Sequence, residues 1–188
     1  MTPRVGSVWS AAERGSLADF LEVYKPGQAT TERMPGGSTL LFRAMSNPDP
    51  RARVAIANQL LDDGADASIV TASPSDSGTV LHALWSVRRE RDIPAEAALL
   101  ARLLDGGADV NYRSPRFGLA IIAMLQKGVI SGDDLLTMWR VLATHSRPDL
   151  SLSTPKGTPL GVALLHHPLL ADPVRAYAAQ SGQTIEES

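Results

Sequence analysis

The chain has 188 residues, of which 44% are hydrophobic and 20% are charged, so it has room for one folded domain or one short repeat array and is not expected to be disordered. Its net charge of -2 lacks the basic excess from which nucleic-acid-binding proteins derive their affinity. The absence of cysteine excludes disulfides, thiolate metal sites and cysteine nucleophiles.

Two short helices are predicted near the N-terminus. Alanine and larger apolar residues at 8–15 predict an inner helix, and those at 16–24 predict an outer helix that packs against it. The Lys-Pro-Gly sequence at 25–27 ends the second helix, because proline and glycine disfavour its continuation. This first pair is degenerate, as expected of a terminal unit that has a neighbour on one side only.

A short inner helix then recurs along the chain. Each copy opens with Thr or Gly and has an apolar residue two positions later. The copies begin at Thr39, Thr79, Gly118 and Thr158, so they are 40, 39 and 40 residues apart. This regular spacing indicates a repeat architecture in which each helix pair stacks on the next one.

A longer outer helix is predicted after each inner helix. Two copies close with Gly-Ala-Asp, at 64–66 and 107–109, and a blurred copy closes at 141–149. Glycine supplies the left-handed residue that ends a helix, and Asp suits the turn beyond it. The predicted starts carry a capping side chain, in most copies close to a proline. These starts are Asp49-Pro50, Asp92-Ile-Pro94, Asp172-Pro173 and a capping box at Ser131-Gly-Asp-Asp134.

These helix pairs resemble the ankyrin repeat, whose unit opens with Thr-Pro-Leu-His-x-Ala and closes with Leu-Leu-x-x-Gly-Ala-Asp-Val-Asn. Thr158-Pro-Leu160 and Thr79-Val-Leu-His82 match parts of the opening. Leu103-Leu104 with Gly107-Ala-Asp-Val-Asn111 matches most of the closing. The similarity spans 8–179. The repeat is longer than the family's period of about 33 residues.

The resemblance implies an all-α fold, an ankyrin-like solenoid of stacked helix-turn-helix repeats with about four to five units. The whole chain, 1–188, is then a single repeat domain. All three tryptophans are predicted to pack in its core. The expected units are 7–36, 37–76, 77–115, 116–155 and 156–180, followed by a polar tail at 181–188.

No catalytic, cofactor-binding or metal-binding residues are predicted. His82 occupies the position at which the resemblance implies a structural histidine that bonds to the junction of loop and helix. His166 and His167 are adjacent, so they point to different sides of a helix and do not form a metal site. An enzyme with a site across units, for example His145 with Asp149, is a third and weaker hypothesis.

Aromatic residues and arginines in the loops between units are candidate partner-binding residues, because these types anchor protein interfaces. The resemblance implies finger-like loop tips there. Arg43, Asn47, Val162 and His166 are placed on the concave inner-helix face. The charged cluster 88–91 is interpreted as a solvated loop, with recognition of an acidic partner as the alternative. The candidate partner-binding residues are Arg33, Met34, Arg43, Arg88, Arg89, Tyr112, Arg113, Arg116 and Phe117.

The expected function is that of a non-enzymatic module that binds another protein through its finger loops and concave inner-helix face. An inhibitor, such as an immunity protein that neutralises a bacterial toxin, is one such role. The alternative is a self-associating scaffold, suggested by the apolar Leu169 and Leu170. We expect no cofactor, nucleic-acid or membrane partner, and a monomer when free. Because residues 1–6 lack the apolar run of a signal peptide and no stretch is long enough to span a membrane, a cytoplasmic location is expected.

Overall fold

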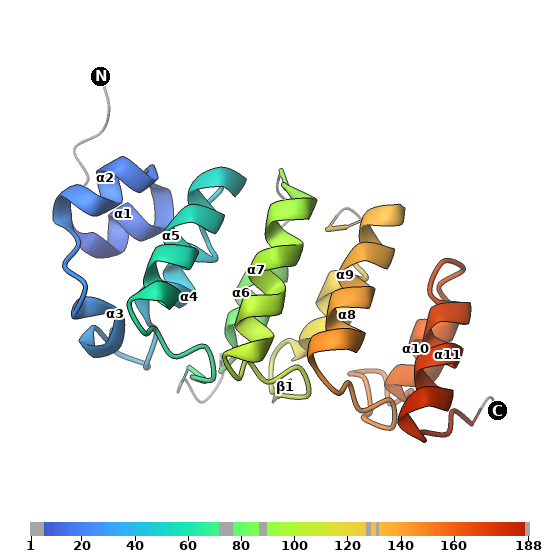
Figure 1. Ribbon diagram of the computed structural model, residues 1–188. Coiled ribbons are helices and arrows are strands. Elements are labelled where there is room, and N and C mark those ends of the chain that lie inside the picture. The colour runs from blue at the N-terminus through green and yellow to red at the C-terminus, as the bar shows by residue number, and fades with distance from the viewer. Residues whose placement is uncertain (1–5, 72–76, 87–89, 127–128, 131, 187–188) are drawn as a thin grey trace.

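The computed structural model describes residues 6–71, 77–86, 90–126, 129–130 and 132–186 (Figure 1). The protein is mostly helical, with 53% helix and little strand, which confirms the predicted all-α class. In chain order the elements are α1 (Val8–Arg14), α2 (Leu17–Val23), α3 (Gln28–Thr31), α4 (Leu40–Ala44), α5 (Pro50–Asp62), α6 (Val80–Trp85), α7 (Ile93–Asp105), β1 (Arg113–Ser114), β2 (Gly118–Leu119), α8 (Ala120–Met124), α9 (Asp133–His145), α10 (Leu160–Leu165) and α11 (Ala171–Ser181).

The helices are arranged as pairs that follow one another from the N-terminal to the C-terminal end (Figure 1). The inner helices are α1, α4, α6, α8 and α10, and their outer partners are α2, α5, α7, α9 and α11. Inner helices contact inner helices, as α4 and α8 both contact α6, and α7 likewise contacts α5 and α9 in the outer layer. The apolar faces of each pair are therefore buried against its neighbours, and one core runs along the row.

The inner helices begin at matching points of each repeat. Their N-cap residues rise in number by 40 at each step and are Thr39, Thr79, Leu119 and Pro159. The helices α8 and α10 thus each begin one residue later than the sequence predicts. Gly118 belongs instead to β2, where its φ is +70° and an added Cβ would lie 2.6 Å from Pro155 Cγ. Glycine is needed there both for the backbone conformation and for the close approach of the next loop.

Two outer helices have the caps that the sequence predicts. Asp49 Oδ1 accepts a hydrogen bond from the backbone N–H of Arg51 at 2.9 Å. Asp92 Oδ1 accepts from the N–H of Ala95 at 3.2 Å. Such a cap satisfies a backbone donor that has no partner inside the helix, and it stabilises a protein by about 1 kcal/mol.

The other two predicted caps are wrong. α9 begins after Gly132, which has a φ of 58° and offers no capping side chain, and Ser131 lies outside the described residues. α11 begins at Ala171, so Asp172 lies in its first turn rather than before it. The cause is the tight turn after α10, in which the N–H of Leu170 bonds to the carbonyl of His167 and leads directly into α11.

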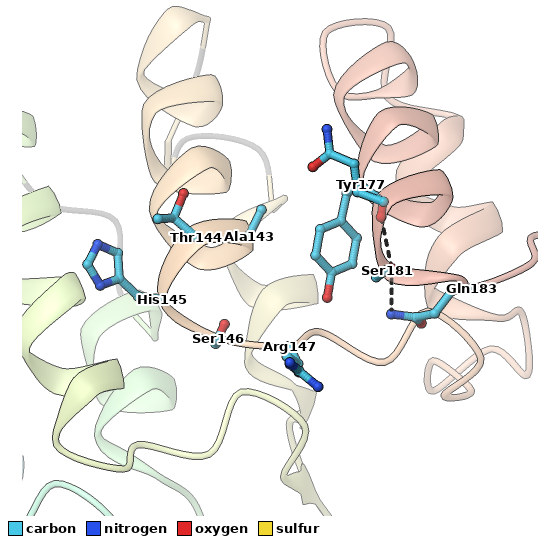
Figure 2. Close-up of a pocket in the computed structure, with 9 residues that line it drawn as sticks. Ala143, Thr144, His145, Ser146, Arg147, Tyr177, Ser181 and Gln183 are labelled. Atoms are coloured by element: carbon cyan, nitrogen blue, oxygen red, sulfur yellow. Dashed lines mark hydrogen bonds between the residues drawn. The ribbon is translucent and has the colours of Figure 1, made fainter.

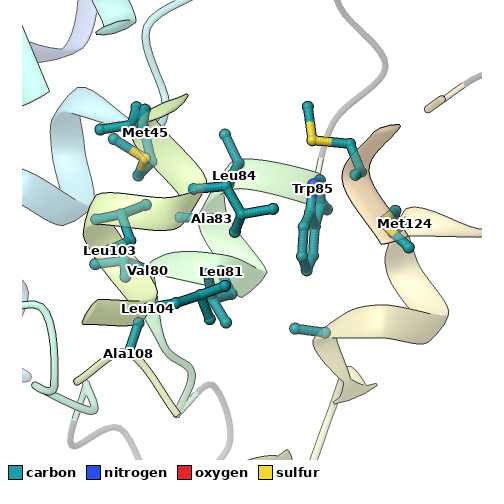
Figure 3. Close-up of a cluster of buried hydrophobic side chains, with 14 of the residues drawn as sticks. Met45, Val80, Leu81, Ala83, Leu84, Trp85, Leu103, Leu104, Ala108 and Met124 are labelled. Carbon is teal, nitrogen blue, oxygen red and sulfur yellow. The ribbon is translucent and has the colours of Figure 1, made fainter. Parts of the chain in front are cut away.

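The core is built mainly from leucine and alanine, with Phe20 and two tryptophans among its largest fully buried side chains. Trp85 and Trp139 are fully buried, as predicted, whereas Trp9 is half-buried against the core. Figure 3 shows the cluster around α6 and α7, with Trp85 on the side of Met124. Each fully buried leucine in such a core contributes roughly 1.5–3 kcal/mol. No helix in the described part of the chain is long and apolar enough to cross a membrane.

The residues after α11 fold back on the last helix pair. Gly182 ends α11 in a left-handed conformation. Gln183 Oε1 accepts from the N–H of Leu150 at 2.7 Å, and Ile185 lies so close to Gly161 that a Cβ there would be 3.0 Å from its side chain. Within the predicted polar tail, Gln183 and Ile185 therefore contact the last helix pair. The last pair has a helical neighbour on one side only, and these residues cover part of its apolar face.

Candidate functional site

Short loops project from one edge of the row, between each outer helix and the next inner helix. We call them finger loops and define them by the described residues 34–38, 71 with 77–78, 113–118 and 154–158. Each is closed by a backbone hydrogen bond or ladder, as between the N–H of Met34 and the carbonyl of Ser38 at 2.9 Å. In the third finger loop, β1 pairs with β2 in an antiparallel ladder. The sequence predicts loops at these places but not the short strands.

His82 of α6 fixes the third finger loop to the inner layer. Its Nδ1 lies 3.2 Å from the N–H of Thr79, and its Nε2 lies 2.9 Å from the carbonyl of Gly118. Nδ1 therefore accepts, and Nε2 carries the proton and donates. Burial lowers the pKa of His82 below its ordinary value of 6.5. The side chain is a neutral structural brace, as the sequence predicts.

A groove of about 560 Å³ crosses α4, α6 and α8 beside the finger loops. Phe42, Ala83, Ile122 and Ala123 form much of its apolar lining. Its rim on the finger side consists of Arg116, Phe117 and Pro155. Positions 43, 83 and 123 are equivalent in the repeat. The first of them holds the large side chain of Arg43, whereas the other two hold alanine, which leaves space over α6 and α8.

Phe117 is an exposed aromatic residue of this rim. Its side chain is 44% exposed, and the Arg116 guanidinium carbon lies 5.2 Å from the centre of its ring. Arg113 is exposed on β1. Tyr112 is half-buried and donates from its hydroxyl to Ser77 Oγ at 2.8 Å, so it links two neighbouring finger loops. The structure thus brings four predicted contact residues together in one loop, with three of them exposed.

The first repeat places three other predicted residues around α4. Arg43 is half-buried, and its guanidinium lies 3.8 Å from Glu13 and donates to Met34 Sδ at 3.4 Å. Arg33 is exposed and donates to the carbonyl of Glu32. Asn47 does not face the concave side as predicted. It is fully buried and donates to carbonyls of the first helix pair, because that pair leaves those acceptors open beyond α1.

Arg88 and Arg89 lie outside the described residues, but their neighbour Arg91 does not line a solvated loop as expected. Its side chain is buried, and Nη1 lies 2.6 Å from Glu96 Oε2. Arg53 of α5 pairs with the other oxygen of Glu96. We call Arg53, Arg91 and Glu96 the ion-pair cluster. The sequence reasoning missed it, because no local pattern marks the pairing of Arg53 in one repeat with Glu96 in the next one.

A second pocket, of about 530 Å³, lies between the ends of α9 and α11 (Figure 2). Tyr177 donates to the carbonyl of Pro148 at 3.1 Å, and burial raises the pKa of its hydroxyl. Gln183 donates to the same carbonyl at 2.9 Å. The polar groups of this pocket mainly bond within the chain, so it joins the last helix pair to its neighbour.

The pairing of His145 with Asp149 that an enzyme site would need is absent. His145 Nδ1 lies 3.0 Å from Asp105, and Asp149 accepts from Ser151 instead. The reason is the repeat, which places the ends of α7 and α9 side by side. In the described part of the chain no group of three His, Asp or Glu side chains is arranged to hold a metal ion.

Comparison with known proteins gives one similar solved structure of note. The chain matches a crystal structure of a functionally unknown protein from Leptotrichia buccalis C-1013-b with a TM-score of 0.70 and 19% sequence identity, over 95% of this chain and 96% of that one. At this identity the likeness concerns the fold alone. No protein-family model matches the chain, and no curated protein matches it either.

Proposed function

We propose that this protein is an ankyrin-like helical repeat module that binds another protein through the groove and the finger loops beside it, and that it acts by binding rather than by catalysis. The observation that carries the proposal is an apolar groove over α6 and α8 whose rim holds the exposed Phe117. Exposed aromatic and arginine side chains around an apolar floor are typical of protein interfaces.

The repeat geometry supports the same proposal. Because the N-caps of the inner helices recur every 40 residues, equivalent side chains of successive units line up across the row. Stacked repeats of this kind make extended binding surfaces, since each unit adds its own strip of surface to that of its neighbour.

Site-specific photo-crosslinking tests the proposal. A photoreactive phenylalanine analogue is placed at Ser86, an exposed residue of the groove, and in a matched variant at Ala98, an exposed residue of α7 in the outer layer. After irradiation in cells that express the chain, we expect a discrete protein adduct from position 86 and none from position 98. Identical adducts from both positions, or none from the groove, would refute the proposal.

An inhibitory role follows as a narrower hypothesis. A segment held in the groove is no longer accessible to other molecules, which is how an immunity protein would neutralise a bacterial toxin. The crosslinked partner is purified and its activity measured with increasing amounts of this chain. Activity that falls to zero at one equivalent supports inhibition, whereas unchanged activity in the saturated complex indicates an adaptor.

Self-association is the second candidate, and exposed apolar residues at the two ends of the row favour it. Leu21 is 47% exposed on α2, and Leu169 is 38% exposed before α11. Leu170, which the sequence also suggested, is fully buried and does not contribute. Light scattering on a size-exclusion column decides the matter. A mass that stays at that of one chain as the concentration rises would eliminate end-to-end stacking.

A further inference from the structure

We propose that the groove binds an extended acidic polypeptide segment, with one large apolar side chain seated over α6 and α8 and with Asp or Glu side chains beside the third and fourth finger loops. This inference rests on the proposed function and adds the chemistry of the partner. It is argued from the shape of the groove floor and from the charges around its rim.

The floor of the groove accepts a bulky apolar side chain. Ala83 and Ala123 present a single methyl group each, where the equivalent position of the preceding repeat carries Arg43. Phe42 and Ile122 are half-buried on either side, so part of their apolar surface is open to solvent. Filling this space removes apolar surface from water on both molecules, which is the main source of affinity at such a site.

The rim of the groove is positively charged. Among the described residues that line it, Arg116 carries a full charge and none is Asp or Glu. His82 also lines the groove, but burial lowers its pKa and keeps the ring neutral near pH 7. The residues 113–118 and 153–158 include Arg113, Arg116 and Lys156 and no acidic residue.

The positive residues are also close together in space. Pro155, next to Lys156, packs against Gly118 of the neighbouring finger loop. The whole chain has a net charge of -2, so these cations are separated from an excess of acidic residues elsewhere. Such a local field attracts negatively charged segments and orients them before contact.

The same features favour a polypeptide over single-stranded nucleic acid. Nucleic-acid grooves combine a row of exposed aromatic platforms with many cations along the backbone. Here the exposed ring is that of Phe117, which Arg116 of the same chain already contacts, and the adjoining floor is aliphatic. One largely aliphatic floor beside a few cations fits a peptide with a single apolar anchor.

Selection from a random-peptide library displayed on phage tests the inference on the full-length chain. We expect enriched sequences in which an aromatic residue, Leu or Met is flanked by Asp or Glu. The synthesised peptides are then titrated against the wild type and four variants. Ala123→Gln fills the groove, and Ala98→Gln on α7 is its matched control. Arg116→Glu with Lys156→Glu reverses the rim charge, and Arg140→Glu on the outer helix α9 is the control.

Binding is expected to weaken about tenfold or more in Ala123→Gln and in the double charge reversal, and to change less than about twofold in the two controls. Added salt should weaken binding to the wild type and have little effect on the double reversal. Circular dichroism of each variant confirms that the fold is retained.

Each other outcome has a definite meaning. Peptides that depend on Ala123 but carry no acidic residues, or that ignore the charge reversal, overturn this inference and leave the proposed function standing. Peptides that bind equally well to the Ala123→Gln variant overturn both. The absence of any enriched peptide overturns the extended-segment binding mode. A fluorescent oligothymidine that binds as tightly as the best peptide assigns the basic rim to nucleic acid instead.

Discussion

The two edges of the helix row are held together in different ways. At the edge where inner helices connect to outer helices, the charged side chains of the ion-pair cluster lie inside the protein. Arg91 also donates to the carbonyls of Leu84 and Val129 at 3.0 Å each, so the cluster ties three repeats to one another. At the finger edge, Arg116 and Lys156 lie outside, and neutral hydrogen bonds close the loops.

The buried charges of the first edge therefore stabilise the fold, whereas the exposed charges of the finger edge are available to a partner. Removing one member of a buried ion pair leaves an uncompensated charge in a low-dielectric interior, which costs several kcal/mol. Removing an exposed charge costs little, because water already screens it. The first edge is thus sensitive to the loss of any member of the ion-pair cluster, whereas exposed charges of the finger edge can be replaced without loss of the fold.

Glu96→Ala should have the largest effect on stability. It leaves Arg53 and Arg91 buried without their carboxylate, and we expect the free energy of unfolding in urea to fall by about 3–5 kcal/mol. Asp105→Ala is the control, because it removes an exposed partner of His145 and should cost under about 1 kcal/mol.

A compensating variant makes this test specific to charge. Replacing Arg53, Glu96 and Arg91 together by Met, Leu and Met removes the unpaired charges and should recover much of the stability lost in Glu96→Ala. If Glu96→Ala unfolds at the same urea concentration as the wild type, the ion-pair cluster does not hold this edge.

His82→Ala should have the next largest effect. It removes the brace between α6 and the third finger loop and leaves the carbonyl of Gly118 without its donor, which we expect to cost about 2 kcal/mol. His166→Ala is the control, since that histidine is exposed and bonds within its own helix. Equal melting temperatures for the two variants would show that the finger loop stays closed without His82.

The pH dependence of stability should identify the same residue. The unfolded chain takes up a proton at His82 near its ordinary pKa of 6.5, whereas the buried ring does so only at lower pH. Folding is therefore favoured above pH 6.5, and stability falls as the pH decreases from 6.5 toward the lowered pKa. In the His82→Gln variant, the part of this fall in stability that is caused by protonation of His82 should disappear. A wild-type melting temperature that rises over that window would contradict the burial of a neutral ring.

The recurrence of the inner helices and two of the outer-helix caps could be predicted, because their causes are local. A capping Asp acts on backbone donors two or three residues away, and this spacing is visible in the sequence at Asp49. The recurrence of Thr39 and Thr79 set the register of the inner helices to within one residue.

The ion-pair cluster could not be predicted, because its partners are distant in sequence. Arg53 and Glu96 are 43 residues apart, and a charged residue on a predicted helix is normally assigned to its solvated face. The groove was missed for a related reason. Its floor comes from alanines on separate helices, and small apolar residues look the same in sequence whether they lie under a neighbour or beside an open space.

Phe117→Ser should have the smallest effect on stability and thereby sharpen the contrast between the edges. The residue is 44% exposed at the groove rim, so the variant loses only part of the buried surface that a core side chain would, and we expect the free energy of unfolding to fall by about 1 kcal/mol. Leu119→Ser, two residues further along at the start of α8, is the internal control, because Leu119 is fully buried and its loss should cost about 3 kcal/mol. Both values come from urea denaturation followed by circular dichroism. If Phe117→Ser destabilises the protein as much as Leu119→Ser, the aromatic ring is part of the core of the finger edge, and it is not available as an anchor for a partner.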